Sequence, residues 1–243
     1  MLILAAGMPR AGSGWHYNLV HDLVVAAGGA DARAIRTHWL LAPLLTEVNC
    51  NIGTLSAPRL FPVQIPSAFG KTFAIKTHSE PRPFAEHMLR KGTLRVSYIY
   101  RDPRAALLSA IEYGERARIA GRDNAFARLM DFEAALKFML GYVKIWQRWM
   151  AVEGIHRVRY EDLLEDYAGE AARLAAFLGA DPSDERVSTV IESYRPEAAA
   201  EGDKGLHFRH GEAERWRGAF AEGELDSVNE VLGGWIEKMG YSI

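Results

Sequence analysis

The loop from Gly7 to Gly14 has the composition of an anion-binding site. Glycines let a backbone approach an anion closely, and the N–H groups at the start of a helix favour negative charge. Ser13 can add a hydroxyl donor, and Arg10 can bind an oxyanion with its forked guanidinium. Gly7 and Gly12 fit the glycine spacing of the nucleotide phosphate loop GxxxxGK[ST], but Ser13-Gly14 stands where that motif needs Lys and then Ser or Thr. An ATP or GTP site is therefore poorly supported, and a turn that binds no ligand is the other alternative.

An arginine and a serine farther along the chain can bind a second anion. Arg101 ends a segment that reads as a strand, and Asp102-Pro103 has the residue types that cap and start a helix. Ser109 follows Asp102 at the i, i+7 spacing and so lies on the same helix face. Arg101 and Ser109 can thus converge on one phosphate. The alternative is an Arg-Asp pair that only ties the helix start together.

Three further segments carry residue types that act on ligands. Residues 76–78 (KTH) end in a histidine, which can act as a general base near neutral pH. Tyr160 offers an aromatic face and a hydroxyl. Residues 209–211 (RHG) lie in a polar stretch that can close over an anion. Taken singly, each segment is as easily structural: a surface histidine, a tyrosine packed at a strand end, or a solvated loop.

These candidates follow segments that read as strands of a parallel sheet. Buried or β-branched runs predict strands at residues 2–6, 72–76, 94–100 and 156–160. Helices are predicted at residues 15–27, 83–91, from 103 onward, and at 132–152, 167–178, 185–194 and 224–239, with a loop at 195–223. This alternation predicts an α/β fold, a P-loop-like, mainly parallel sheet flanked by helices on both faces. Ligands bind such sheets beyond the carboxyl ends of the strands, where the candidate residues fall.

Residues 30–70 are interpreted as a partly irregular excursion that can cover a site. Residues 34–36 fit a short strand, and four prolines interrupt the rest: Pro43, Pro58, Pro62 and Pro66. Aromatic residues in and after this stretch can line an apolar acceptor pocket, although such residues more often belong to the core: Phe61, Phe69, Phe84 and Tyr113.

Length and composition predict a single domain over residues 1–243. The chain is 49% hydrophobic and 25% charged, with a formal net charge of −2 at pH 7. Such a charge predicts no nucleic-acid partner and no general attraction to anionic membranes, so an anionic ligand needs a local basic cluster. The single cysteine, Cys50, allows no disulfide within the chain and fits a reducing cytoplasm. No apolar run reaches the roughly 20 residues that a membrane-spanning helix needs.

Taken in order, these segments resemble the sulfotransferases that use 3′-phosphoadenosine-5′-phosphosulfate (PAPS). Residues 9–15 (PRAGSGW) are similar to the family's phosphosulfate loop, roughly P-[KR]-S-G-T-T-W. Residues 76–78 match the family's K-T-H motif, and Arg101 with Ser109 matches its R-D-P-R motif with a later serine. Residues 160–163 match its Y-E-D-L motif, and residues 209–211 match its R-K-G motif. Each motif is modest, but coincidence does not readily give five of them in the same order.

The resemblance implies an enzyme that moves a sulfuryl group from PAPS to a hydroxyl or amine of a small-molecule or carbohydrate acceptor. It implies His78 as the general base, with Arg10 and Lys76 stabilising the leaving phosphate, and adenosine 3′,5′-bisphosphate (PAP) as the product. No metal is implied, because the protein supplies the positive charge. The cofactor contacts that it implies are Arg10, Ala11, Gly12, Ser13, Gly14, Trp15, Arg101, Ser109, Tyr160, Arg209, His210 and Gly211.

Three residues depart from the family pattern. Ala11 and Gly14 each replace a hydroxyl residue, and His210 replaces a lysine, which makes that charge pH-dependent. The missing loop hydroxyls favour one alternative, a non-catalytic nucleotide-binding protein of the same fold. The other alternative, a P-loop-type small-molecule kinase, is disfavoured by Ser13-Gly14. The sequence indicates neither the acceptor nor the oligomeric state.

Overall fold

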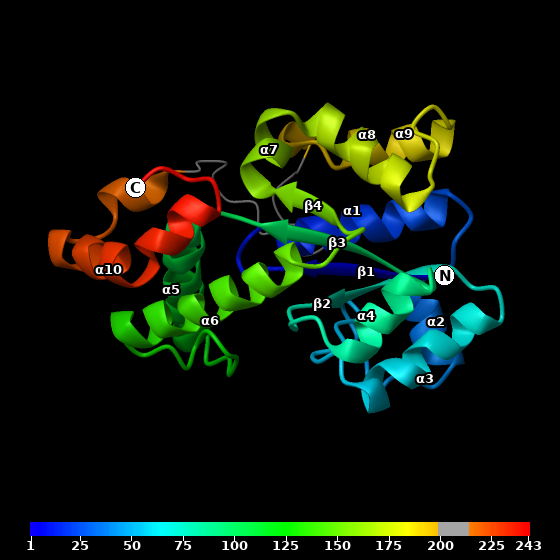
Figure 1. The fold of residues 1–243 in the computed structure, drawn as a ribbon, viewed down its shortest axis with the longest axis horizontal. Coiled ribbons are helices and arrows are strands. Elements are labelled where there is room, and N and C mark those ends of the chain that lie inside the picture. The colour runs from blue at the N-terminus through cyan, green and yellow to red at the C-terminus, as the bar shows by residue number, and fades with distance from the viewer. Residues whose placement is uncertain (199–213) are drawn as a thin grey trace.

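The central sheet consists of parallel strands whose order differs from their order in the chain. The computed structural model describes residues 1–198 and 214–243. Within them the strands β1 (Leu2–Gly7), β2 (Phe73–Thr77), β3 (Leu94–Tyr100) and β4 (His156–Arg159) lie in the order β2-β1-β3-β4 (Figure 1). All three pairings are parallel, so the carboxyl ends of the strands share one edge. The four predicted strands are confirmed, and the first two are buried along their whole length, as expected of a sheet covered on both sides.

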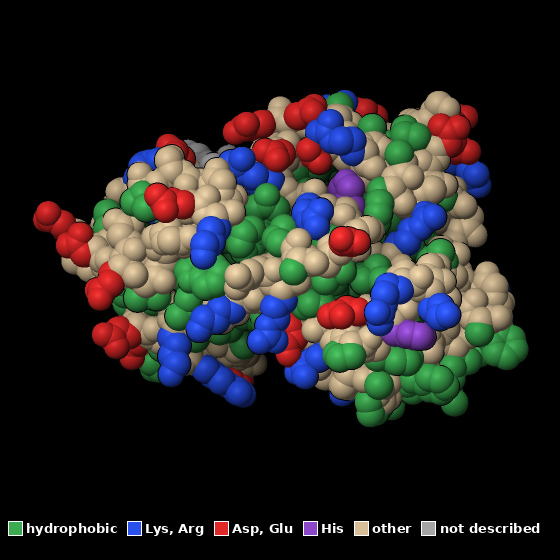
Figure 2. Space-filling view, viewed as in Figure 1, with side chains coloured by type: hydrophobic (Ala, Val, Ile, Leu, Met, Phe, Trp, Pro, Cys, Tyr) green, Lys and Arg blue, Asp and Glu red, His purple; other side chains and the backbone are tan. Residues whose placement is uncertain are grey.

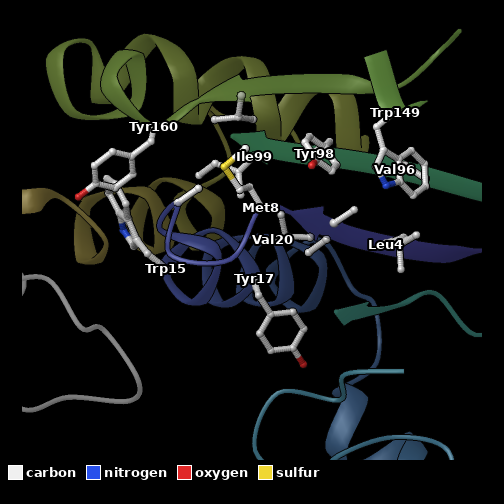
Figure 3. Close-up of a cluster of buried hydrophobic side chains, with 14 of the residues drawn as sticks. Leu4, Met8, Trp15, Tyr17, Val20, Val96, Tyr98, Ile99, Trp149 and Tyr160 are labelled. Atoms are coloured by element: carbon white, nitrogen blue, oxygen red, sulfur yellow. The ribbon is translucent and has the colours of Figure 1, made fainter. Parts of the chain in front are cut away.

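Helices cover both faces of the sheet. Ser97 and Tyr98 are neighbours in β3, so their side chains point to opposite faces. Ser97 Oγ lies 2.8 Å from Nε2 of His16 in α1 (Ser13–Ala26). The ring of Tyr98 packs against Trp149 of α6 (Phe132–Met150), with 5.9 Å between ring centroids (Figure 3). Because α1 and α6 therefore lie on opposite faces, the predicted α/β class is confirmed.

The remaining helices flank the sheet or extend beyond its edge. In chain order they are α2 (Ala32–His38), α3 (Ala57–Ala68), α4 (Pro83–Arg90), α5 (Pro103–Ile119), α7 (Tyr160–Glu165), α8 (Tyr167–Leu178), α9 (Glu185–Ser193) and α10 (Glu222–Lys238). Both α8 and α9 pack with α1, and α10 packs with α5 and α6 on the left of Figure 1. The described ends of the predicted 195–223 loop form two short 3₁₀ turns, Pro196–Ala198 and Arg215–Gly218.

A helix replaces the short strand predicted at residues 34–36, so that prediction is wrong. These residues lie in α2, because the carboxylate of Asp31 caps the helix start. Its Oδ1 accepts from the N–H of Arg33 at 2.6 Å and from that of Ala34 at 3.0 Å. An aspartate before a helical run is a recognisable start signal, and the sequence interpretation missed it.

A second helix, α3, contains three of the four prolines that were expected to break this region. Pro58 lies in the first turn, where its missing N–H costs little. Pro62 and Pro66 lie inside the helix, which is anchored by buried side chains, Leu60 and Val63 among them. The irregular part of the excursion is therefore limited to residues 39–56.

The surface carries charges of both signs. On the face drawn in Figure 2, basic and acidic side chains are interspersed, and apolar side chains gather at the lower right. Phe61 of α3 is among the exposed large apolar residues. None of the helices in the described ranges has the length and apolarity needed to cross a bilayer.

Candidate active site

The loop between β1 and α1 is shaped by backbone geometry at two positions. Arg10 and Gly12 have positive φ angles of 64° and 74°. Glycine adopts this conformation freely, whereas a residue with a Cβ is held there at a cost of about 1–2 kcal/mol. The N–H of Met8 donates to the carbonyl of Ile99 at 2.9 Å, which ties the loop to β3. Because α1 begins at Ser13, the first N–H groups of the helix, which have no acceptor within it, lie at the end of this loop.

The loop lies directly against the tyrosine that begins α7. A Cβ atom on Gly12 would lie 2.6 Å from Cδ2 of Tyr160, far inside contact distance. Tyr160 was predicted to end a strand, but β4 stops at Arg159 and Tyr160 is the first residue of the helix. The absence of a side chain at position 12 therefore lets the first loop and α7 share one site.

Arg10 joins two motifs that the sequence analysis assigned to different anions. Its Nε donates to Oγ of Ser109 in α5 at 3.1 Å. Its guanidinium carbon lies 4.5 Å from the ring centroid of Tyr113 and 5.8 Å from that of Phe126. Burial is the main cause that lowers the pKa of Arg10, and the positive charge of Arg101 acts in the same direction. Arg10 nevertheless stays charged, because arginine does not deprotonate in proteins.

Lys76 and His78 lie at the carboxyl end of β2, and both have lowered pKa values. Lys76 is buried, and desolvation followed by the charge of Arg10 lowers its pKa to about 8. Burial, followed by the charge of Lys76, lowers the pKa of His78 to about 4. Nδ1 of His78 lies 2.7 Å from the carbonyl of Gly7, so in the neutral ring Nδ1 donates and Nε2 keeps its lone pair. His78 is therefore neutral at neutral pH, with the lone pair of Nε2 available.

Aromatic rings and a guanidinium build the opposite end of the site. The guanidinium carbon of Arg101 lies 4.4 Å from the ring centroid of Tyr160. The ring of Trp15 meets that of Tyr160 edge-on, with 6.2 Å between ring centroids (Figure 3). It also stacks on the ring of Tyr167, at 5.8 Å between centroids. Its Nε1 donates to the carbonyl of Tyr194 at 3.0 Å. These contacts fix Trp15 and Tyr160 next to Arg101.

One cavity of about 330 Å³ connects these groups. Ten of the catalytic and cofactor-binding residues named from the sequence line it: Arg10, Gly12, Ser13, Gly14, Trp15, Lys76, His78, Arg101, Ser109 and Tyr160. Ala11 is fully buried and is not among the lining residues. Residues 209–211, which hold the remaining candidates Arg209, His210 and Gly211, lie outside the described residues.

A run of aromatic rings connects His78 with Phe126 and Tyr113, the two rings of the run that line the cavity. The ring of His78 is 6.5 Å from that of Tyr142, which is 4.9 Å from Phe138. Phe138 is 5.6 Å from Phe126, and Phe126 is 5.3 Å from Tyr113 beside Arg10. An apolar surface therefore lies next to the candidate base.

The structure changes the set of residues expected to face an acceptor. Of the four aromatic residues considered from the sequence, Tyr113 lines the cavity, whereas Phe61, Phe69 and Phe84 are not among its lining residues. Four lining residues were missed: Pro9, Val48, Asn49 and Phe126. Val48 and Asn49 belong to the irregular stretch predicted to cover a site, which was the available signal. No motif or periodicity marked Phe126.

The assembled groups can bind a doubly anionic ligand and accept a proton. Two arginines, a buried lysine and helix N–H groups supply positive potential, while the neutral His78 supplies a base. In the part of the chain that the structure describes, no three His, Cys, Asp or Glu side chains are grouped as metal ligands.

The sequence matches a family model. Residues 2–242 match the model of the sulfotransferase domain. Among curated proteins, the chain is similar to sulfotransferase 6B1 of Danio rerio, with 20% identity over 95% of this chain and 76% of the relative. It is also similar to sulfotransferase 2B1 of Mus musculus, with 22% identity over 92% of this chain and 68% of the relative.

Solved structures share the fold at low sequence identity. A retinol dehydratase in complex with retinol and PAP aligns with a TM-score of 0.60 and 18% identity, covering 97% of this chain and 81% of that one. Mouse sulfotransferase SULT7A1 complexed with PAP aligns with a TM-score of 0.59 and 17% identity, covering 97% and 84%. Both alignments span almost all of this chain.

Proposed function

The chain belongs to the sulfotransferase domain family, and we propose that it transfers the sulfuryl group of PAPS to a hydroxyl or amine of a small-molecule or carbohydrate acceptor. One observation carries the proposal. A single cavity brings together the loop at Arg10, the neutral His78 and the distant Arg101. That arrangement fits a donor with an anionic group at each end and a reaction that needs a base between them.

The residues present suit the two anionic groups of PAPS. Arg10 and the N–H groups at the start of α1 would hold the 5′-phosphosulfate. Arg101 and Ser109 would hold the 3′-phosphate, together with residues 209–211. Trp15 and Tyr160 would border the adenine. The proximity of Gly12 to Tyr160 supports this assignment, because it places the candidate contacts for both ends on one continuous surface.

The proposed proton acceptor is Nε2 of His78. The carbonyl of Gly7 holds the Nδ1 proton, so Nε2 can remove the proton of the acceptor hydroxyl or amine. When bound, PAPS supplies the sulfuryl group, whose sulfur forms a bond to the acceptor as its bond to the phosphate oxygen breaks. The released species are the sulfated acceptor and PAP.

Arg10 and Lys76 are proposed to stabilise the charge that grows on the leaving phosphate oxygen. Fixed cations and N–H donors lower a barrier when they interact more strongly with the transition state than with the ground state. Lys76 is buried, so its charge is weakly screened by water.

The aromatic run beside His78 favours an acceptor with an apolar face. Phenols, steroid-like alcohols, long-chain alcohols and sugars that stack on rings all meet this condition. Relatives of the same fold have been solved with retinol or with androsterone bound, which places such molecules in the test panel. A single domain and a cytoplasmic location stay predictions from the sequence.

Transfer of labelled sulfate from PAPS to a panel of these acceptors tests the proposal. We expect at least one labelled product, and a higher melting temperature in the presence of PAP, since a ligand that binds only the native state stabilises it. A melting temperature that rises with magnesium-ATP and not with PAP would contradict the proposal and favour the kinase. A melting temperature that rises with PAP, without transfer to any acceptor, would favour the non-catalytic alternative.

A further inference from the structure

Glu161 connects the two residues proposed to bind the nucleotide. It directly follows Tyr160, and its Oε1 accepts from the N–H of Asp102 at 3.2 Å. Asp102 directly follows Arg101, whose guanidinium lies over the ring of Tyr160. One carboxylate therefore bridges the backbone beside Arg101 and the helix that carries Tyr160.

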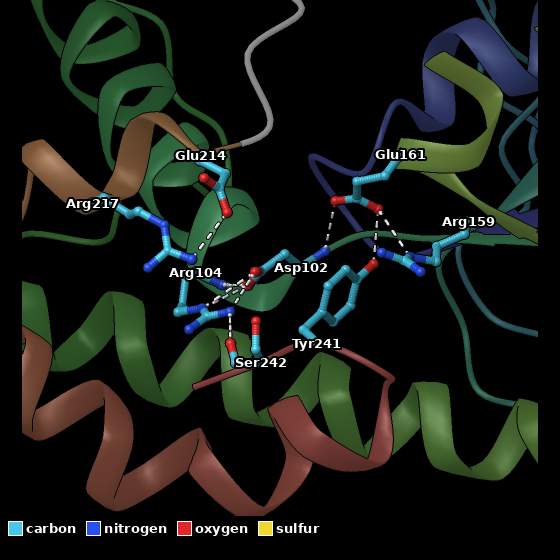
Figure 4. Close-up of polar contacts among 8 residues, drawn as sticks. All are labelled: Asp102, Arg104, Arg159, Glu161, Glu214, Arg217, Tyr241 and Ser242. Atoms are coloured by element: carbon cyan, nitrogen blue, oxygen red, sulfur yellow. Dashed lines mark hydrogen bonds and ion pairs between the residues drawn. The ribbon is translucent and has the colours of Figure 1, made fainter. Parts of the chain in front are cut away.

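The other oxygen of this carboxylate is held by a residue that follows α10. The hydroxyl of Tyr241 donates to Oε2 of Glu161 at 2.8 Å, and both side chains are buried (Figure 4). The guanidinium of Arg159 lies 4.6 Å from the ring centroid of Tyr241, and its Nε lies 3.8 Å from the same carboxylate oxygen. Burial raises the pKa of Tyr241, so the hydroxyl keeps its proton and remains a donor.

The neighbouring residue makes a second connection to the same turn. The carbonyl of Ser242 accepts from Nη2 of Arg104 at 2.6 Å. Arg104 donates to both carboxylate oxygens of Asp102 (Figure 4). Its guanidinium carbon lies 3.9 Å from the ring centroid of Trp216. Residues 241 and 242 therefore reach both sides of the turn that follows Arg101.

We propose that Tyr241 is a positioning residue for recognition of the nucleotide 3′-phosphate, acting through Glu161 on Arg101 and Tyr160. The inference rests on the proposed function, because it assumes that Arg101 reads that phosphate. Without the phenol hydroxyl, the carboxylate of Glu161 loses the hydrogen bond from Tyr241 to its Oε2. The turn at Asp102 then gains freedom, and the Arg101 side chain must be ordered when the ligand binds.

The expected defect is selective. Tyr241 connects to the 3′-phosphate end of the cavity, whereas Arg10, Lys76 and His78 belong to the loop end and to β2. Its loss should raise the KM for PAPS and leave kcat close to wild type. Loss of Tyr241 should weaken the binding of PAP, which carries the 3′-phosphate, more than the binding of adenosine 5′-monophosphate, which lacks it.

Calorimetry of the Tyr241→Phe variant with these two nucleotides tests the proposal. The substitution removes only the hydroxyl and leaves the ring against Arg159. We expect the Kd of PAP to rise about threefold to tenfold, which is part of what loss of a buried hydrogen bond to a charged group can cost, with little change for adenosine 5′-monophosphate.

Tyr194→Phe is a matched control. Tyr194 is also 9% exposed, and its hydroxyl also donates to a carboxylate, Oδ2 of Asp22 at 2.6 Å, but in α1. This variant should lower the melting temperature without changing the ratio of the two nucleotide affinities. In a Glu161→Gln background, Tyr241→Phe should change that ratio much less, because the acceptor of its hydroxyl has already been altered.

The outcomes separate this inference from the proposed function. If wild-type protein binds PAP no better than adenosine 5′-monophosphate, the proposed 3′-phosphate site itself is wrong. If wild type prefers PAP and Tyr241→Phe keeps the full preference, only the role of Tyr241 is wrong. Equal weakening of both nucleotides, with the same loss of melting temperature as the control, would mean that Tyr241 is merely structural.

Discussion

The two ends of the cavity are built in different ways. At the loop end, Arg10 and the N–H groups at the start of α1 come from one continuous segment, residues 7–15, whose shape is set by the backbone at Arg10 and Gly12. Lys76 and His78, at the carboxyl end of β2, complete this end. At the nucleotide end, Arg101 and Tyr160 come from separate strand ends and are joined by Glu161 and Tyr241, which are 80 positions apart in the chain. A local loop can keep its shape when distant residues change. An end assembled over long range depends on packing elsewhere in the molecule.

The largest expected effect lies at the loop end. His78→Ala should lower kcat by about 10²–10⁴-fold, because the general base is lost. PAP affinity should change little, since His78 is not among the proposed nucleotide contacts. Turnover is measured with the best acceptor from the panel, and PAP binding by calorimetry. Near-normal turnover with intact PAP binding would remove His78 from this role.

The next largest effect is expected at the nucleotide end, where binding of PAP should be reduced. Arg101→Ala should weaken the binding of PAP by about 10- to 100-fold, the range expected for a lost charge-assisted hydrogen bond. The binding of adenosine 5′-monophosphate should be affected far less. Calorimetry with both nucleotides measures the difference. Equal losses would show that Arg101 does not distinguish the 3′-phosphate.

A third substitution tests the contact between the two ends. Gly12→Ala places a methyl group against Tyr160 and forces a non-glycine residue into a left-handed backbone. We expect PAP to bind about tenfold more weakly and the melting temperature to fall, because strain and displacement of the ring add. Gly53→Ala, also at positive φ but with open space around its Cβ position, is the control for backbone strain alone. If both variants bind PAP equally well, the loop and Tyr160 do not form one surface.

The smallest expected effect is a pH dependence at the loop end. Lys76 has a pKa lowered to about 8, so it is charged below that pH and loses its charge above it. Because kcat/KM reports the free enzyme, it should fall about fivefold between pH 7 and about pH 8.7. The fall caused by protonation of His78 should lie far below this range, because the pKa of His78 is lowered to about 4. A Lys76→Arg variant should remove the alkaline fall. An alkaline fall that persists unchanged in Lys76→Arg would assign it to another group.

Elements with local signals in the sequence could be predicted. The strands and the first loop follow from local signals: buried runs, a glycine at position 12, and a helix start at once afterwards. The helix at α2 was missed although Asp31 carried its capping signal, because the short run of residues 34–36 equally fits a strand. The helix α3 was missed because its internal prolines have a low helix propensity, which tertiary packing overrides.

Contacts between distant segments could not be predicted in the same way. Arg10 and Ser109, which are 99 positions apart, were assigned to separate anions, yet they touch. Phe126 enters the cavity only because α5 and the following turn place it beside Tyr113. Glu161 and Tyr241 carry no motif that links them. Such pairs depend on how the layers pack, which no single segment encodes.

The left-handed backbone of Arg10 bears on how this protein can change over time. A glycine at that position would relieve strain of about 1–2 kcal/mol and would also delete the guanidinium that binds Ser109. Substitution by glycine would therefore exchange backbone strain for the loss of the contacts of Arg10 with Ser109, Tyr113 and Phe126. It would also remove a cationic side chain from the cavity.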